Sequence, residues 1–165
     1  MSSENPVAPT SDNGGSATIE GGQAGRLEHR EIRKYLRQRA PFLLVDRILQ
    51  VDAHTAVGVK NISATDPGLE GHFAEDPIYP GVLLIEAMSQ VGGVLLAHDP
   101  QYSSAREGYL TGVDKVRFKR FVRPGDQVVI TATKVKTWGP HARVAVESAV
   151  DGRQVARGEV SYYLR

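Results

Sequence analysis

The sequence predicts an α+β fold in which antiparallel strands cover one long apolar helix. The run from Gly81 to Ala97 is apolar nearly all round, and a helix of that kind has to be buried on every side. Four later segments alternate apolar and polar residues as strands do, at positions 109–118, 126–138, 141–150 and 154–164. Turn signals such as Asp151-Gly152 separate these strands. Strands wrapped around the helix would give both kinds of element a shared core.

A membrane span is the obvious alternative for the apolar helix. The run follows Pro80, which favours a helix start, and it is shorter than the ~20 residues that a bilayer requires. It also contains Glu86, Ser89 and Gln90, which are polar. We therefore interpret the run as a core helix and expect no association with a membrane.

The segments before this helix predict smaller elements. Apolar residues at helical spacing predict a short amphipathic helix over 28–36. Residues 42–51 are typical of a loop that leads into a strand, and 54–62 alternate as a hairpin partner would. Residues 1–25 are rich in Ser, Gly, Asn, Pro and Ala, which predicts a disordered leader without the basic start and apolar core of a secretory signal. Residues 26–165 are then expected to form one domain.

Composition excludes several kinds of site. The chain has no cysteine, which rules out disulfides, thiolate zinc sites, iron–sulfur clusters and a cysteine nucleophile. This composition suits a reducing compartment, and we expect a cytoplasmic protein. Lys and Arg together number 20 against 19 for Asp and Glu, so the net charge does not indicate nucleic acid as a partner.

Two residues suggest acid–base chemistry. A carboxylate inside a buried helix is costly when ionised, so Glu86 should tend to stay protonated and could act as a general acid. Gln90 lies one helical turn further on, where it can orient that carboxyl group. His72 precedes the helix in a turn-prone loop, and histidine is the side chain best suited to act as a base near neutral pH. Taken singly, Glu86 could instead pair with an arginine, and His72 could be a structural loop residue.

The start of the helix offers a third component. Gly81 has no side chain, so an oxygen atom of a ligand can approach its N–H closely. The partial positive charge of a helix N-terminus stabilises an oxyanion or enolate without a metal. A base, an acid and an oxyanion donor together suit β-elimination next to a thioester carbonyl, and no metal-ligand spacing relates His72 to Glu86.

Three motifs in the same order resemble one known family. The segment Gly71–Gln90 (GHFAEDPIYPGVLLIEAMSQ) resembles the signature of the 3-hydroxyacyl-[acyl-carrier-protein] dehydratases of type II fatty acid synthesis. Arg39–Arg47 (RAPFLLVDR) and Val113–Phe118 (VDKVRF), followed by Pro124-Gly125-Asp126, are also similar to that family. The resemblance extends from about Leu36 to the C-terminus.

The resemblance implies a hot-dog fold, in which a curved antiparallel sheet wraps a long central helix, and a dimer or a trimer of dimers. It implies dehydration of (3R)-3-hydroxyacyl chains, carried on the phosphopantetheine arm of acyl carrier protein, to trans-2-enoyl chains without a cofactor. His72 matches the family's catalytic base and Glu86 its acid, the two coming from opposite protomers. Tyr109 matches a position that lines the acyl tunnel. Gly81 and Glu86 lie roughly 140° apart around the helix, which is compatible with a shared site.

A cationic strip is the candidate docking surface for the carrier protein. It consists of Lys115, Arg117, Lys119 and Arg120. These residues follow a predicted strand, on which Val116 and Phe118 are expected to face inward. Such a strip would attract an acidic carrier protein, although a solvated strand face is the simpler interpretation of the pattern alone.

Three positions depart from the family pattern, and all of them flank the acid–base pair. Residues 36–39 read Leu-Arg-Gln-Arg where the family has Leu-Pro-His-Arg, Ala74 replaces a proline, and Tyr79 replaces a methionine. A dehydratase of a specialised polyketide or lipid pathway is therefore an open alternative. So is a hot-dog acyl thioesterase, which would use the helix carboxylate as a base toward water. A non-catalytic acyl-carrier subunit would be expected to lack His72 or Glu86.

Overall fold

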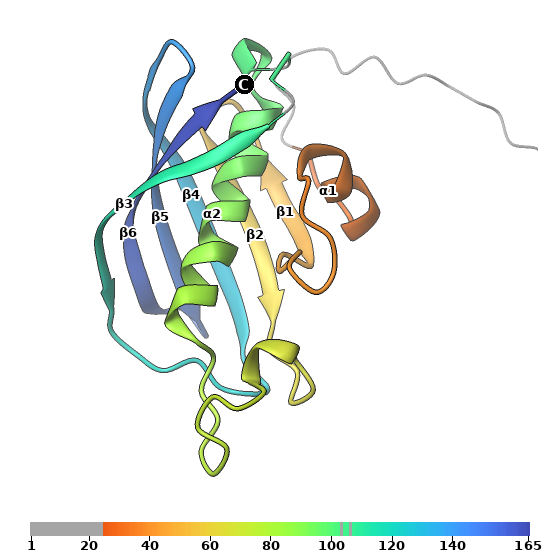
Figure 1. Ribbon diagram of the computed structural model, residues 1–165, viewed down its shortest axis with the longest axis vertical. Helices are drawn as coiled ribbons and strands as arrows, with labels where there is room; N and C mark the ends of the chain where they lie inside the picture. The colour runs from red at the N-terminus through yellow and green to blue at the C-terminus, as the bar shows by residue number, and fades with distance from the viewer. Residues whose placement is uncertain (1–24, 103, 106) are drawn as a thin grey trace, which may run out of the picture.

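In the computed structural model one long helix lies along the face of an antiparallel sheet (Figure 1). The structure describes residues 25–102, 104–105 and 107–165. The leader expected over residues 1–25 falls outside this range except for Gly25. The N–H and C=O groups of Gly25 both pair with Val51 at 2.9 Å, so the described chain begins beside the first strand.

The described chain contains ten helices and strands. They are α1 (His29–Tyr35), β1 (Arg47–Val51), β2 (Thr55–Asn61), the 3₁₀ helix η1 (Pro67–Leu69), α2 (Gly81–His98), the 3₁₀ helix η2 (Pro100–Tyr102), β3 (Gly108–Phe118), β4 (Gln127–Trp138), β5 (His141–Val150) and β6 (Arg153–Leu164). The helix and strands predicted from the sequence are confirmed, with ends that differ by few residues.

The strands form one sheet in the order β1-β2-β4-β5-β6-β3, and each neighbouring pair is antiparallel. Helix α2 packs mainly against the central strands β2, β4 and β5. At one side β3 contacts the same helix, so that the sheet curls around it (Figure 1). This arrangement confirms the predicted α+β fold with a sheet wrapped around a central helix.

The interior consists largely of aliphatic side chains from α2 and the sheet. On β5 the alternating residues Val144, Val146 and Ser148 are buried, whereas Arg143 and Glu147 are exposed. Contrary to the expectation from its length, the 18-residue helix α2 is long and apolar enough to cross a bilayer, but 56% of it is buried inside the fold. The helix therefore serves as the core of the sheet, as its all-round apolar surface predicts.

Strand β3 is the least covered strand of the described sheet. Its residues are exposed or half-buried throughout, and two register shifts interrupt its pairing with β6. Phe118, which was expected to face inward, is 50% exposed, and its ring lies beside Gly81 at the start of α2. Because β3 lies at the sheet edge and only part of it contacts α2, its apolar side chains remain largely accessible.

Candidate active site

Glu86 lies half-buried near the middle of α2, where it lines a cavity of about 240 Å³. The cavity lies between α2, the connection that follows α1, strand β3 and the end of β6. Its lining includes Leu36, Gln38, Glu86, Gln90, Gly93 and Tyr109. A larger and more open groove of about 730 Å³ lies over strands β3 to β6, but it contains neither Glu86 nor His72.

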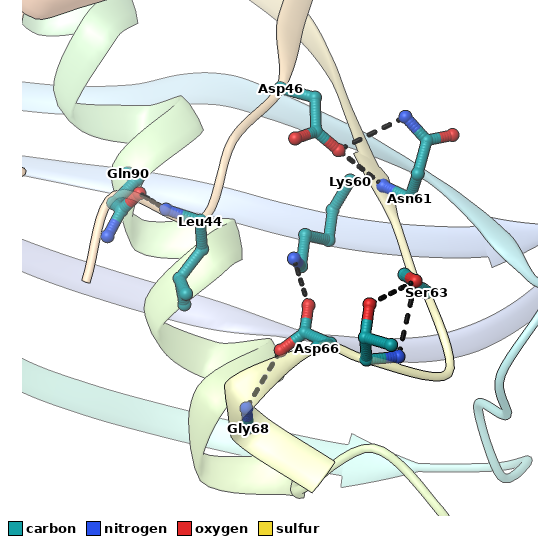
Figure 2. Close-up of polar contacts among 9 residues, drawn as sticks. Leu44, Asp46, Lys60, Asn61, Ser63, Asp66, Gly68 and Gln90 are labelled. Atoms are coloured by element: carbon teal, nitrogen blue, oxygen red, sulfur yellow. Dashed lines mark hydrogen bonds and ion pairs between the residues drawn. The ribbon is translucent and has the colours of Figure 1, made fainter. Parts of the chain in front are cut away.

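Two hydrogen bonds to backbone groups fix the orientation of the Gln90 side-chain amide. Its Oε1 accepts from the Leu44 N–H at 2.8 Å (Figure 2), and its Nε2 donates to the Phe42 carbonyl at 2.7 Å. The same Nε2 donates to Glu86 Oε1 at 2.9 Å. An amide nitrogen can only donate here, so Oε1 of Glu86 is an acceptor. A proton on the neutral carboxyl group is therefore directed to Oε2, the oxygen that Gln90 leaves free.

Burial raises the pKa of the Glu86 carboxyl group above its usual value of 4.5. Hydrogen bonding from the side chains of Gln90 and Gln38 lowers the pKa, but by less than burial raises it. Burial dominates because water solvates the charged form better than this partly apolar site does. The raised pKa favours the protonated form, as a general acid requires.

His72 lies in the loop between η1 and α2, which extends beyond the N-terminal end of the helix (Figure 1). Its Nδ1 lies 2.7 Å from the Ile78 carbonyl oxygen. Because that oxygen can only accept, Nδ1 carries a hydrogen, and in the neutral form of the ring the lone pair is then on Nε2. Phe73 packs edge-on against the imidazole with ring centres 4.5 Å apart. The ring is thus fixed in the tautomer that can accept a proton at Nε2.

Gly81 begins α2, and strand β3 closely covers it. A Cβ atom added to Gly81 would come within 2.9 Å of the Phe118 ring. A side chain at this position would have to displace the Phe118 ring, and the first turn of the helix lies beside an exposed aromatic surface. Val82 next to it is 73% exposed.

The structure places the predicted site residues in two groups within one chain. Glu86, Gln90 and Tyr109 line the same cavity, where the Tyr109 hydroxyl donates to Glu107 at the rim. His72 and Gly81 are not among the residues that line it. For Gly81 and Glu86, which are about 140° apart around α2, helix geometry predicts this separation.

The cationic strip is exposed along its whole length. Lys115 and Arg117 line the open groove on the outer side of the sheet, beside Glu147 and Glu159. Arg120 instead lines a smaller depression of about 450 Å³ at the other end of the strip. The strip therefore follows the sheet edge but is not one continuous pocket.

Sequence reasoning missed Gln38 as a neighbour of the acid. Its half-buried side chain lines the cavity and lowers the pKa of Glu86. The only available signal was its departure from the family's histidine at that position. Among the described residues, no group of three or more His, Asp or Glu side chains is placed to hold a metal ion.

A long central helix wrapped by an antiparallel sheet is the hot-dog fold. Solved structures share this fold. The dehydratase heterocomplex ApeI:P from Xenorhabdus doucetiae matches with a TM-score of 0.71 at 20% identity, over 81% of this chain and 90% of that one. A hypothetical thioesterase with coenzyme A from Streptococcus pneumoniae matches with a TM-score of 0.58 at 13% identity, over 72% and 84%. At these identities the likeness concerns the fold alone.

Sequence comparison is more specific. The model of a family described as FabA-like domain matches residues 36–159. The chain is 42% identical over 136 residues to the 3-hydroxyacyl-[acyl-carrier-protein] dehydratase FabZ of Streptococcus pneumoniae, which covers 82% of this chain and 96% of that one. It is 43% identical over 130 residues to the enzyme of the same name from Syntrophobacter fumaroxidans, over 79% and 88%. The chain therefore belongs to the FabA-like family, among the 3-hydroxyacyl-[acyl-carrier-protein] dehydratases.

Proposed function

We propose that the protein dehydrates (3R)-3-hydroxyacyl-[acyl-carrier-protein] to the trans-2-enoyl form in fatty acid biosynthesis, with His72 as base and Glu86 as acid. The observation that supports this most strongly is the hydrogen bonding at Glu86. Gln90 donates a hydrogen bond to Oε1 of Glu86, and burial raises the pKa of that carboxyl group. The proton of the neutral form is therefore expected on Oε2. Family membership supplies the substrate class.

The proposed reaction assigns one step to each of these groups. The thioester carbonyl oxygen accepts from the Gly81 N–H, which withdraws charge from C2. Nε2 of His72 removes a proton from C2, and those electrons form the C2=C3 double bond. The C3–O bond breaks as Oε2 of Glu86 protonates the hydroxyl group, which leaves as water. The imidazolium then returns its proton through solvent, and the ionised Glu86 regains one, so that no cofactor takes part.

A homodimer is part of the proposal, because one chain does not bring its own base and acid together. Strand β3 is an edge strand with exposed apolar side chains, which are Tyr109, Leu110, Val113 and Phe118. An uncovered apolar edge is suited to pairing with a second copy. Pairing there would bring the His72 loop of one protomer toward the Glu86 cavity of its partner. A trimer of dimers would preserve the same shared site.

The cationic strip is the proposed docking surface for acyl carrier protein. Lys115, Arg117, Lys119 and Arg120 are exposed on or just beyond β3, the strand that also lines the acid cavity. An acidic partner would be attracted there and could deliver its phosphopantetheine arm to the adjacent site. We also propose a cytoplasmic location, since enzyme and carrier have to share a compartment.

The test is to incubate the purified protein with crotonyl and longer 2-enoyl thioesters while monitoring enone absorbance, with a thiol reagent in parallel. We expect enone to disappear without thiol release, because hydration is the reverse of the proposed reaction. His72→Ala and Glu86→Gln should each reduce the rate by at least about 100-fold. Matched controls are His54→Ala and Glu75→Gln, which change exposed residues of the same types.

Each other outcome has a definite meaning. Thiol release would identify a thioesterase and contradict the proposal. Retained hydration in His72→Ala would exclude this base. Activity restricted to unusual acyl chains would leave the chemistry intact and assign the enzyme to a specialised polyketide or lipid pathway.

A further inference from the structure

A second buried polar cluster lies outside the Glu86 cavity, next to the loop that carries His72. Lys60 on β2 forms an ion pair with Asp66 (Figure 2), and the two side chains are only 9% and 8% exposed. A buried ion pair adds little net stability over an apolar pair, because the desolvation of both charges offsets their attraction. Such a pair is better suited to specifying one local arrangement of the chain.

Asp66 connects this pair to the start of the His72 loop. Its Oδ1 accepts from the Gly68 N–H at 2.8 Å and so caps η1 (Figure 2). The last residue of η1, Leu69, is buried, and its carbonyl oxygen accepts from the His72 N–H at 3.1 Å. A continuous series of contacts therefore connects Lys60 to the backbone of His72.

Tyr79 connects the same pair to the end of the loop. The Lys60 ammonium group lies 5.6 Å from the centre of the buried Tyr79 ring. The Tyr79 N–H donates to the Val122 carbonyl at 2.7 Å, which holds this part of the backbone in place. The residue before it, Ile78, supplies the carbonyl that binds Nδ1 of His72. Both ends of the loop thus lie against one ion pair.

Between these two ends the loop is held at the surface, where Asp76 forms an ion pair with Arg123 and its N–H donates to the Phe73 carbonyl at 3.0 Å. Residues 73–76 are exposed. Gly71 and Phe73 have positive φ angles of 75° and 60°. A phenylalanine in that conformation is strained, and it persists only where the surroundings hold it. The buried contacts at the two ends of the loop add to the restraint that the exposed Asp76–Arg123 ion pair supplies.

We propose that Lys60 and Asp66 are positioning residues for His72, whose loop their buried ion pair holds at both ends. The pair keeps Nδ1–H on the Ile78 carbonyl and Nε2 available to the substrate. The role of the His72 ring in catalysis rests on the proposed function. The position and tautomer of the ring do not depend on that function, and both can be measured without substrate.

The test replaces both charges at once with Lys60→Met/Asp66→Asn. The introduced asparagine side chain keeps an oxygen that can cap η1, and the double change leaves no unpaired buried charge. The readout is the ring ¹⁵N chemical shifts of His72 in ¹⁵N-histidine-labelled full-length protein, assigned with His72→Ala. At a pH where the ring is neutral, the parent should show one protonated Nδ1 and one unprotonated Nε2. The double variant should show averaged shifts, and kcat should fall by about 10- to 100-fold with KM little changed.

The chain contains a matched control. Lys134 and Asp99 form a second ion pair whose side chains are both 14% exposed, and Asp99 caps η2 through the Gln101 N–H at 2.9 Å. This pair lies at the opposite end of α2 from His72. Lys134→Met/Asp99→Asn should lower thermal stability to a similar degree but leave the His72 ring shifts unchanged.

Two results would overturn the proposal. Unchanged His72 shifts in folded Lys60→Met/Asp66→Asn would mean that the pair only stabilises the protein. Equal changes of the His72 shifts in both double variants would indicate that the whole fold loosens, rather than the His72 loop alone. Should the first variant not fold, Asp66→Asn alone removes the ion pair and keeps an oxygen that can cap η1, and unchanged shifts in that folded variant would equally contradict the idea. An active His72→Ala enzyme would instead overturn the proposed function and leave the shifts interpretable.

Discussion

At Glu86, burial and hydrogen bonding act on one carboxyl group in opposite directions. Burial raises its pKa, and the amide groups of Gln90 and Gln38 lower it to a smaller extent. The folded protein therefore prefers the neutral form more strongly than the unfolded chain does. A general acid needs this bias, but the protein loses stability when the group ionises.

Glu86→Gln should therefore stabilise the protein at neutral pH. A raised folded-state pKa contributes stability at low pH that is lost as the pH rises through that pKa. The difference in melting temperature between variant and parent should be small near pH 4.5, the usual pKa, and should grow as the pH rises above it. Thermal melts across that pH series measure it. A difference independent of pH would show that ionisation of Glu86 is not the cause.

Gln90→Ala should reduce both stability and activity. It leaves the Leu44 N–H and the Phe42 carbonyl without their partner, at about 1–3 kcal/mol for each buried unpaired group. It also frees the carboxyl group of Glu86 to rotate, so kcat should fall further than loss of folded protein explains. Denaturant titration and kcat on the folded fraction separate the two effects. Gln38→Leu, which removes only the other amide, should affect kcat with little loss of stability.

How far these residues could be predicted depends on the separation of their partners in sequence. The pairing of Gln90 with Glu86 follows from helical periodicity, because the two are four residues apart. The bonds from Gln90 to Phe42 and Leu44 join residues more than 40 positions apart, and no local pattern encodes them. Gln38 lies beside Glu86 for the same nonlocal reason.

Among the elements, α2 was predictable because it is apolar all round, and β5 because its burial alternates. Strand β3 was only partly predictable. Its register shifts lie between Leu110 and Gly112 and between Asp114 and Arg117, and Lys115 has a positive φ of 54°. Bulges of this kind depend on the neighbouring strand, so the alternation of the sequence alone does not determine which side chains of β3 are covered.

The contact between α2 and β6 should be sensitive to a single methyl group. The Tyr162 hydroxyl donates to the Ser89 carbonyl at 2.6 Å, and a Cβ on Gly92 would come within 2.4 Å of that hydroxyl. Gly92→Ala should therefore destabilise the protein by about 1–3 kcal/mol. Gly93→Ala is the control, since its Cβ would meet only Leu36 Cδ2 at 3.2 Å. Denaturant unfolding should show a much smaller effect, or a slight gain, in that variant; equal losses would contradict the contact.

For the whole molecule, the apolar surface of β3 predicts assembly through that edge. Val113→Lys places a charge on this strand, and a buried unpaired charge weakens an interface. The dimer dissociation constant should rise by at least about tenfold, and activity should fall at low protein concentration. Sedimentation velocity measures the first and the enone assay the second. Val135→Lys changes a comparably exposed valine on β4 and should leave both unchanged.

In the proposed dimer, His72 of one protomer and Glu86 of its partner form one dehydratase site. Mixing differently tagged His72→Ala and Glu86→Gln chains under conditions of subunit exchange tests it most directly. A mixed dimer then contains one site with both changes and one intact site, so random exchange should restore about one quarter of the parent activity. The mixed dimers can be purified by both tags to confirm exchange. If purified mixed dimers remain as inactive as the single variants while the parent is active, the shared site is contradicted.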